Sequence, residues 1–298
     1  MKAIIYTKYG PPDVLELRDI EKPIPKDNEV LIRVYAATVN RSDCAMLRAK
    51  PFIMRFFTGL FKPNKRILGT DFAGMIEAIG KNVASIEVGE KVFGFDDGGL
   101  SSHAEYMTLS EDNALATMPK NMTYEQAAAS IEGAHYAYNF INKVNIERGQ
   151  KVLVNGATGA IGSAAVQLLK YFEANVTAVC RAKDADLVKS LGANKVIDYT
   201  REDFTNSGEK YNFVFDTVGK STFKKCKPLL VSKGVYMSSE LGPMVQNPFL
   251  ALITPIFGSR KVKFPFPTNR GRSVRLIKKL SQTKKFRAVI DRTYSLDK

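Results

Sequence analysis

Residues 151–169 read Lys151-Val-Leu-Val-Asn-Gly156-Ala-Thr-Gly159-Ala-Ile-Gly162-Ser-Ala-Ala-Val-Gln-Leu-Leu. An apolar run leads into glycines spaced GxxGxxG and then into an amphipathic stretch, which predicts a strand, a tight turn and a helix. Dinucleotide binding needs this arrangement: the chain turns sharply, bare backbone approaches a pyrophosphate, and a helix N-terminus faces the anion. We therefore expect residues 156–162 to bind a dinucleotide cofactor.

Strand and helix patterns alternate around this stretch, from the Met118-Pro119 step onward. Such alternation predicts a doubly wound α/β domain with a parallel sheet and helices on both faces. We expect strands at 152–155, 176–180, 195–197, 213–215 and 235–238, and helices at 123–142, 161–172, 184–191, 222–231 and, outside that unit, 272–280.

The first third of the chain has a different pattern, with short β-branched runs broken by Pro and Gly. Closely spaced short strands of this kind are typical of a compact barrel. They are expected at 4–6, 14–18, 30–39, 72–79, 91–95 and 103–109.

The residues after the strand at 176–180 indicate which cofactor is bound. NAD-binding versions of the motif usually place Asp or Glu there to accept from the ribose 2′-hydroxyl. Here the chain reads Cys180-Arg181-Ala182-Lys183, and Arg181 can bind a 2′-phosphate with its guanidinium fork. This favours NADPH, although Arg181 and Lys183 could also be solvent-exposed residues before a helix.

Charge and cysteine content exclude several classes of protein. The net charge of the 298 residues is +14, and residues 260–298 hold 13 Lys/Arg against two acids. Attraction of an anion and a merely solvated face both explain such charge.

The three cysteines, Cys44, Cys180 and Cys226, form no CxxC pair, which argues against a disulfide scaffold or a structural zinc lobe. No apolar run is long enough to span a bilayer and no signal-peptide pattern opens the chain, so a cytoplasmic location is expected.

Further motifs give the chain a family resemblance. Leu191 to Tyr199 (LGANKVIDY), Phe215 to Gly219 (FDTVG), Gly69 to Gly74 (GTDFAG) and Val88 to Gly94 (VGEKVFG) occur in the order seen in the medium-chain dehydrogenase/reductase superfamily. The chain resembles its zinc-free quinone oxidoreductase branch over nearly its whole length. The resemblance implies a GroES-like β-barrel catalytic domain at 1–118 and a Rossmann doubly wound domain at 119–267. Residues 268–298 would be a shortened return to the catalytic domain, since relatives continue with another helix and strand.

The resemblance also implies roles for single residues. Tyr199 matches a tyrosine beside the 2′-phosphate, the turn at 216–219 lies beside the cofactor, and Ser238 and Ser239 lie near the nicotinamide. His135 matches a helix that approaches the cofactor, although a core position is equally consistent. The expected cofactor-binding set is Gly156, Ala157, Thr158, Gly159, Ala160, Ile161, Gly162, Arg181, Lys183, Tyr199, Asp216, Val218 and Ser239.

Metal ligands of zinc-dependent relatives are replaced in this chain. Asn40 stands in place of a metal-binding Cys, and Gly69-Thr70-Asp71 stands in place of Gly-His-Glu. Neither an amide nor a hydroxyl substitutes well for these ligands, so no metal is expected.

Without zinc, reduction of an electrophilic acceptor is more plausible than oxidation of an alcohol. We expect hydride transfer from NADPH to a quinone or α,β-unsaturated carbonyl, with alignment and an oxyanion hydrogen bond as the protein's main contributions. Asn40 is the expected catalytic donor, although it could instead be a turn residue after its strand. The final proton could come from water.

Two further features leave alternatives open. The run from Pro51 to Phe61 (PFIMRFFTGLF) could line an apolar substrate pocket, pack in a core or subunit contact, or meet a membrane surface, and the first two are favoured. The chain could also be an NADPH-binding sensor or scaffold whose basic surface contacts RNA or membrane. The expected partners are a small apolar carbonyl or quinone substrate and, from the resemblance, a second copy in a homodimer.

Overall fold

The computed structural model describes residues 1–297, and its contacts divide the chain into two compact units. Unit 1 comprises Met1–Glu132 and the chain from Arg270 onward, and unit 2 comprises Gly133–Asn269. This division assigns residues 119–132 to unit 1, whereas the sequence-based division starts the dinucleotide-binding domain at 119.

Unit 2 is built on a six-stranded parallel sheet with the strand order β10-β9-β8-β11-β12-β13. The order reverses between β8 and β11, and ligands of such sheets bind at the carboxyl ends of the strands near that point. The predicted Rossmann doubly wound fold of this part of the chain is confirmed. The strands are β8 (Lys151–Asn155), β9 (Asn175–Cys180), β10 (Lys195–Asp198), β11 (Tyr211–Asp216), β12 (Leu230–Ser238) and β13 (Lys261–Val262).

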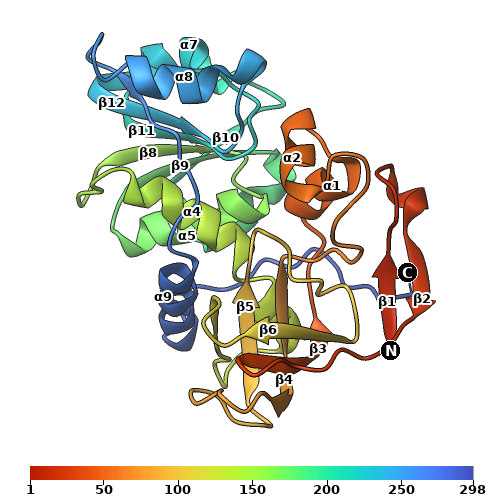
Figure 1. Cartoon of the computed structure of the whole chain (residues 1–298). Coiled ribbons are helices and arrows are strands. Elements are labelled where there is room, and N and C mark those ends of the chain that lie inside the picture. Colours follow the sequence, from red (N-terminus) through yellow and green to blue (C-terminus); the bar gives the residue numbers. More distant parts are fainter. Residues whose placement is uncertain (298) are drawn as a thin grey trace. The chain divides into compact units, whose positions relative to one another are not determined.

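Helices lie on both faces of this sheet: α4 and α5 on one side, and α7 and α8 on the other (Figure 1). Their bounds are α4 (Glu132–Asn142), α5 (Ala160–Tyr171), α6 (Ala185–Ser190), α7 (Phe223–Cys226) and α8 (Gln246–Ile253), with 3₁₀ turns at Ala182–Asp184, Phe204–Asn206, Lys227–Leu229 and Pro243–Val245. Buried apolar side chains from the strands and from α7 form one core cluster, which includes Leu153, Val214 and Tyr236.

Unit 1 contains a five-stranded antiparallel sheet with the order β6-β3-β4-β5-β7. A hairpin of β1 (Lys2–Ile5) and β2 (Glu16–Asp19) joins it through isolated bridges. The remaining elements are β3 (Glu29–Ala36), β4 (Asp71–Ile79), β5 (Lys91–Phe95), β6 (Tyr106–Ser110), β7 (Leu115–Thr117), α1 (Arg41–Arg48), α2 (Arg55–Thr58), α3 (Tyr124–Ala128) and α9 (Arg270–Gln282), with 3₁₀ turns at Pro12–Val14 and Phe52–Met54.

Two predicted helices differ from the observed ones. The helix expected at 123–142 is broken into α3 and α4, and the Ser130 hydroxyl donates to the Ala127 carbonyl at the break, a bond that competes with the helical ladder. The helix expected at 222–231 ends at Cys226, and Leu230 and Val231 already belong to β12. A 3₁₀ turn at Lys227–Leu229 follows, and Pro228 within it lacks the N–H that would continue the α-helical hydrogen bonds.

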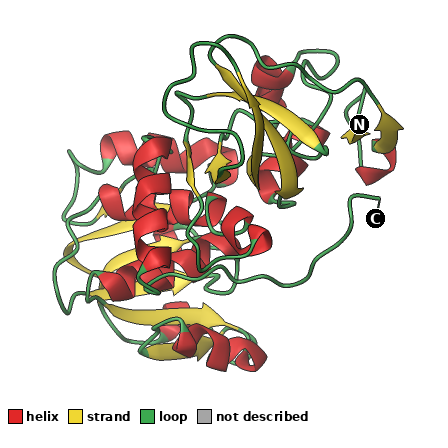
Figure 2. Cartoon of the chain, turned by 90° about the horizontal axis from the view of Figure 1, so that it is seen from below, coloured by secondary structure: helices red, strands yellow, loops and turns green. Residues whose placement is uncertain are grey.

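The end of the chain packs on unit 1. α9 contacts β5 and β7, and the Asn121 amide donates to the Ser281 carbonyl at 3.0 Å. After α9, residues 286–297 form neither helix nor strand, and Figure 2 shows them as an extended loop.

Replacement of Gly162 tests the packing that holds α5 on the sheet. A Cβ atom at Gly162 would lie 2.1 Å from the Gly156 carbonyl oxygen and 2.8 Å from the Ala157 Cα atom. Both neighbours are backbone, so Gly162→Ala should lower the free energy of unfolding by about 1–3 kcal/mol in urea titrations. Gly159→Ala is the matched control, because its Cβ atom would make only an ordinary contact of 3.6 Å at a φ of −72°. Equal losses in both variants would contradict this account of the packing.

Candidate functional site

The glycine-rich loop after β8 is shaped by contacts of its own backbone. Gly156 has a φ of 81°, and a Cβ atom there would lie 2.4 Å from a Val218 methyl group. The N–H groups of Gly156 and Ala157 both donate to the Val179 carbonyl, at 3.2 and 3.1 Å, which ties the loop to β9. The Ala157 side chain is fully buried, so this predicted site residue can offer a ligand only its backbone.

The first turn of α5 offers unpaired backbone donors. Its N-cap is the exposed Gly159, and among the described residues no side chain caps the helix. The N–H groups of Ala160, Ile161 and Gly162 lie in the first turn, where an α-helix provides no acceptor. Because these donors sit at the positive end of the helix dipole, the turn suits an anion. Thr158, also predicted as a site residue, is half-buried in the same loop.

The predicted 2′-phosphate residues lie at the ends of two paired strands. Arg181 and Lys183 follow β9 and are exposed, and Tyr199 follows β10 with 54% of its surface exposed. β9 and β10 pair in parallel with Asp198 opposite Cys180, and the Tyr199 N–H donates to the Cys180 carbonyl at 3.2 Å. The Arg181 Nε atom lies 3.8 Å from the Asp184 carboxylate. The structure therefore gathers two cations and an exposed ring at one edge of the sheet.

Asp216 is fully buried at the end of β11 and holds neighbouring strands together. Its carboxylate accepts from the Asn155 amide at 3.0 Å and from the Tyr236 hydroxyl at 3.2 Å, which connects β8 and β12. It also accepts from the backbone N–H groups of Lys220 at 3.3 Å and Ser221 at 2.8 Å. These four bonds give Asp216 the geometry of a brace for the strand ends.

Val218 and Ser239 lie beside this brace. Val218 packs against Gly156, and the Ser239 N–H donates to the Asp216 carbonyl at 3.0 Å. The Ser239 hydroxyl is buried and has no hydrogen-bond partner among residues 1–297. An orphaned buried hydroxyl at the carboxyl edge of the sheet fits a site completed by a polar ligand.

Asn40 is the N-cap of α1, in unit 1. Its side-chain oxygen accepts from the Asp43 N–H at 3.0 Å, while the Asp43 carboxylate accepts from the Asn40 N–H at 3.1 Å. The Asn40 amide also donates to the Thr70 hydroxyl at 2.7 Å, and its contact with the Thr38 hydroxyl is longer, at 3.5 Å. This capping box places the expected catalytic side chain beside Thr70 and leaves one amide proton without a short hydrogen bond.

Three carboxyl groups are buried close to this cap. Asp71 accepts from the Thr38 N–H and hydroxyl at 2.8 and 2.7 Å, and Glu132 accepts from the Ser42 hydroxyl at 2.6 Å. Burial raises the pKa of Asp71 to about 7 against these hydrogen bonds, and burial also raises the pKa of Asp43. The pKa of Glu132 is raised well above its usual range by burial and then by the negative charge of Asp71.

These carboxyl groups do not form a recognisable metal site. Within residues 1–297 no group of three or more His, Cys, Asp or Glu side chains is arranged to hold a metal ion. His103 directs Nε2 to the Thr38 carbonyl at 2.9 Å and lies 3.9 Å from the Asp43 carboxylate. His135, in α4, is fully buried.

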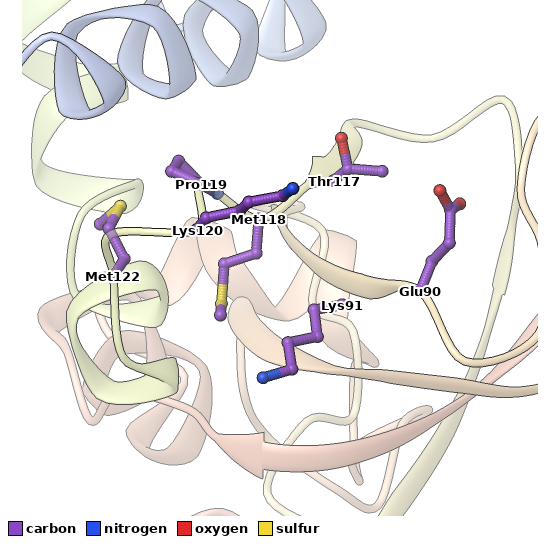
Figure 3. Close-up of a pocket in the computed structure, with 7 residues that line it drawn as sticks. All are labelled: Glu90, Lys91, Thr117, Met118, Pro119, Lys120 and Met122. Atoms are coloured by element: carbon purple, nitrogen blue, oxygen red, sulfur yellow. The ribbon is translucent and has the colours of Figure 1, made fainter.

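A hollow of about 380 Å³ lies elsewhere in unit 1, beside β5 and β7 (Figure 3). It contains none of the predicted site residues. Its lining is Glu90, Lys91, Thr117, Met118, Pro119, Lys120 and Met122. Because none of the predicted cofactor-binding or catalytic residues line this hollow, we assign it no part in the reaction.

The pH dependence of stability tests the burial of Asp71. Burial raises the pKa of Asp71 from its ordinary value of 3.8 to about 7 in the folded chain, so the folded state binds the proton more tightly. Because the unfolded chain releases this proton at a lower pH than the folded chain, the free energy of unfolding falls as pH rises from about 4 to about 7. Asp71→Asn mimics the protonated group, so the variant should gain stability over the wild type across this window in urea titrations. A stability difference that is independent of pH would contradict the raised pKa.

Comparison with known proteins identifies the family. Residues 26–120 match the alcohol dehydrogenase GroES-like domain, and residues 191–298 match the family described as zinc-binding dehydrogenase. A chloroplastic quinone oxidoreductase of Triphysaria versicolor is 31% identical, over 100% of this chain and 92% of the relative. A chloroplastic NADPH-dependent alkenal/one oxidoreductase of Arabidopsis thaliana is 34% identical over 74% of this chain. The match spans only 58% of the length of that relative, as it does for a tomato reductase.

Comparison of the fold with solved structures finds relatives of the same kind. The structure of the quinone oxidoreductase from Coxiella burnetii superposes with a TM-score of 0.87 at 26% identity, covering 100% of this chain and 92% of that one. Both family domains therefore occur in order along a chain that aligns over its whole length. The chain belongs to the medium-chain dehydrogenase/reductase superfamily, in its quinone oxidoreductase branch.

Proposed function

We propose that the chain is an oxidoreductase that uses NADPH to reduce a quinone or an α,β-unsaturated carbonyl. The observation that carries the proposal is that unit 2 has both a helix N-terminus without a side-chain cap, at Gly159, and exposed cations after β9. The printed names of the relatives agree with it, since one is an NADPH-dependent alkenal/one oxidoreductase and others are quinone oxidoreductases. The sensor or scaffold alternative has no support among these names.

The residues of unit 2 fit NADPH group by group. The N–H groups of residues 160–162 would hold the pyrophosphate, since nothing larger than hydrogen projects from Gly159. Arg181 and Lys183 would bind the 2′-phosphate beside Tyr199. The orphaned Ser239 hydroxyl would gain a partner from the cofactor, and the Asp216 brace would hold the 216–219 turn and Ser239 in place.

When bound, NADPH would supply the hydride, and we propose Asn40 as the polar group for the acceptor. The remaining amide proton of Asn40 would donate to the acceptor carbonyl oxygen, where negative charge develops during hydride transfer. The capping box and Thr70 fix this amide before substrate arrives, so little reorganisation is needed. Water would supply the final proton.

We propose that this reaction does not use zinc. Asn40 and Thr70 stand where zinc-dependent members of the superfamily bear Cys and His, and here the two side chains bond to each other. Carboxamide and hydroxyl groups are poor zinc ligands beside thiolate and imidazole. Quinones and enones accept hydride without a Lewis acid, so the acceptor class agrees with this donor set.

The cellular location and the oligomeric state of the protein are predictions. No helix within residues 1–297 is both long and apolar enough to cross a bilayer. We propose a cytoplasmic location from the sequence and a homodimer from the family resemblance. Gel filtration with light scattering would test the homodimer, and a monomer at micromolar concentration would contradict it.

Replacement of Arg181 tests the choice of cofactor. Arg181→Glu removes a charge-assisted hydrogen bond to the 2′-phosphate and adds repulsion, so the dissociation constant of NADPH should rise about 10-fold or more. Binding of NADH, which lacks this phosphate, should change much less. Lys170→Glu is the matched control, since this exposed lysine lies at the other end of α5. Equal effects of Arg181→Glu on both nucleotides, measured by fluorescence titration, would contradict the phosphate assignment.

The same protein should oxidise NADPH when a small panel of quinones and enones is added. Absorbance at the nicotinamide band measures the rate. Turnover of at least one acceptor is the expected result. NADPH binding without turnover of any acceptor would contradict the acceptor class, and binding of neither nucleotide would contradict the whole proposal.

Replacement of Asn40 separates its two roles. Serine caps helices as well as asparagine but has no amide, so Asn40→Ser should keep the stability within about 0.5 kcal/mol and lower kcat/KM about 10- to 100-fold. Asn40→Ala loses the cap as well and should cost about 1 kcal/mol of stability. Full activity of the serine variant would show that Asn40 acts only as the N-cap of α1.

A further inference from the structure

The segment from Pro51 to Phe61 in unit 1 displays an unusual number of exposed apolar side chains. Phe56, Phe57 and Phe61 are 70%, 77% and 86% exposed. Phe52, Ile53 and Leu60 are also exposed. Met54 is the exception, since it packs against the cluster formed by Tyr6, Met46, Leu47 and Leu68. An interpretation of the whole segment as core therefore does not fit unit 1, because six of its large side chains lie at the surface.

The segment is held in this conformation by polar contacts behind the apolar side chains. The Tyr9 hydroxyl lies 2.9 Å from the Thr58 hydroxyl and donates to the Gly59 carbonyl at 2.7 Å. The Arg55 guanidinium lies over the Tyr9 ring at 5.0 Å and donates to the Leu60 carbonyl at 3.2 Å. The exposed rings are therefore presented by a short structured segment, formed by the 3₁₀ turn at Phe52–Met54 and by α2 (Figure 1).

Cations surround these side chains. Residues 48–66 contain six Lys/Arg and no acidic residue. Arg55 and Lys65 also bond to backbone carbonyls, whereas Arg48, Lys50, Lys62 and Arg66 are exposed. Apolar side chains that project between Lys and Arg are the pattern of protein surfaces that bind in the interface of an anionic bilayer.

A second copy of the chain fits this surface less well. In a two-fold dimer the same patch would face itself and bring six cations against six without an acid in the segment to offset them. The bases of single-stranded RNA could stack on the exposed phenylalanines but not on Ile53 and Leu60, so stacking does not account for the whole apolar patch. Charge and shape both favour a lipid surface.

Unit 2 has another exposed apolar surface, which provides a contrast. It is formed by Met244, Val245, Phe249, Leu252, Ile256 and Phe257. The segment 243–257 contains no charged residue. It therefore offers no electrostatic preference for an anionic surface, and it serves as the control.

We propose that the segment 48–66 docks the protein on the surface of an anionic bilayer, with the phenylalanines in the interface and the lysines and arginines at the lipid phosphates. The inference is independent of the proposed function, because it rests on exposure and charge in unit 1 alone. It would place a reductase of apolar acceptors next to the phase in which such acceptors dissolve.

Flotation of the full chain with lipid vesicles tests the proposal. The bound fraction should be at least about tenfold higher on vesicles of phosphatidylcholine with 30% phosphatidylglycerol than on phosphatidylcholine alone, and it should fall as salt is raised. The triple variant Phe56→Gln, Phe57→Gln, Phe61→Gln should reduce binding about tenfold. Lys50→Glu with Lys62→Glu should remove the preference for anionic lipid. Unchanged melting temperatures would show that both variants are folded.

Two control variants make the test specific. Phe249→Gln, Leu252→Gln, Phe257→Gln removes three exposed apolar side chains from unit 2, and Lys284→Glu with Lys285→Glu makes the same change of charge at exposed residues after α9. Both should bind anionic vesicles like the wild type. The proposal is overturned if the wild type does not prefer anionic vesicles, or if the controls lose as much binding as the segment variants. It is also overturned if the segment variants lose binding only to a single-stranded RNA or only to a second copy.

Discussion

The first turn of α5 passes so close to the loop after β8 that a single methyl group at Gly162 would collide with the carbonyl of Gly156. This close approach places the helix N-terminus at the carboxyl edge of the sheet, beside the point where the strand order reverses. The backbone donors of the first turn therefore lie beside the loop that follows β8. A larger residue at position 162 would force the helix or the loop to shift.

The carboxyl edge of the sheet is then completed by buried polar contacts. Asp216 bonds groups on β8 and β12 and in the following turn, so three strand ends and a loop are held by one carboxylate. Because that carboxylate already accepts four hydrogen bonds, its contribution to cofactor binding would be to position its neighbours. Besides the N–H groups of the first turn of α5, the orphaned Ser239 hydroxyl and the exposed Arg181 and Lys183 have capacity left for a ligand.

The sequence predicts the parallel sheet well, because strand and helix periods differ and glycine spacing marks one turn strongly. It predicts local breaks less well. The apolar pattern continues through the interruption at Ser130, where the side chain donates to the Ala127 carbonyl. The signal for α1 is present in Asn40 and Asp43, whose spacing is that of a capping box, but no helix is among the elements expected there.

Burial explains the other differences. Glu132 lies at the start of a helix, where acids are usually solvated, and its burial depends on Ser42, which is distant in sequence. Nothing in the local pattern distinguishes such a residue from a surface one. Ala157 similarly belongs to the glycine motif, yet its side chain points into the core. The exposure of the phenylalanines near Phe57 could not be predicted either, because an apolar run is more often core than surface.

The central claim is that the chain moves a hydride from NADPH to carbon or oxygen of an electrophilic acceptor. The most direct measurement uses NADPH carrying deuterium at the transferable position of the nicotinamide, with an enone as acceptor and mass spectrometry of the product. We predict that the saturated product gains a single deuterium at its β-carbon and that NADH serves less well as donor. A product without deuterium, or no product while NADPH is bound, would contradict the account.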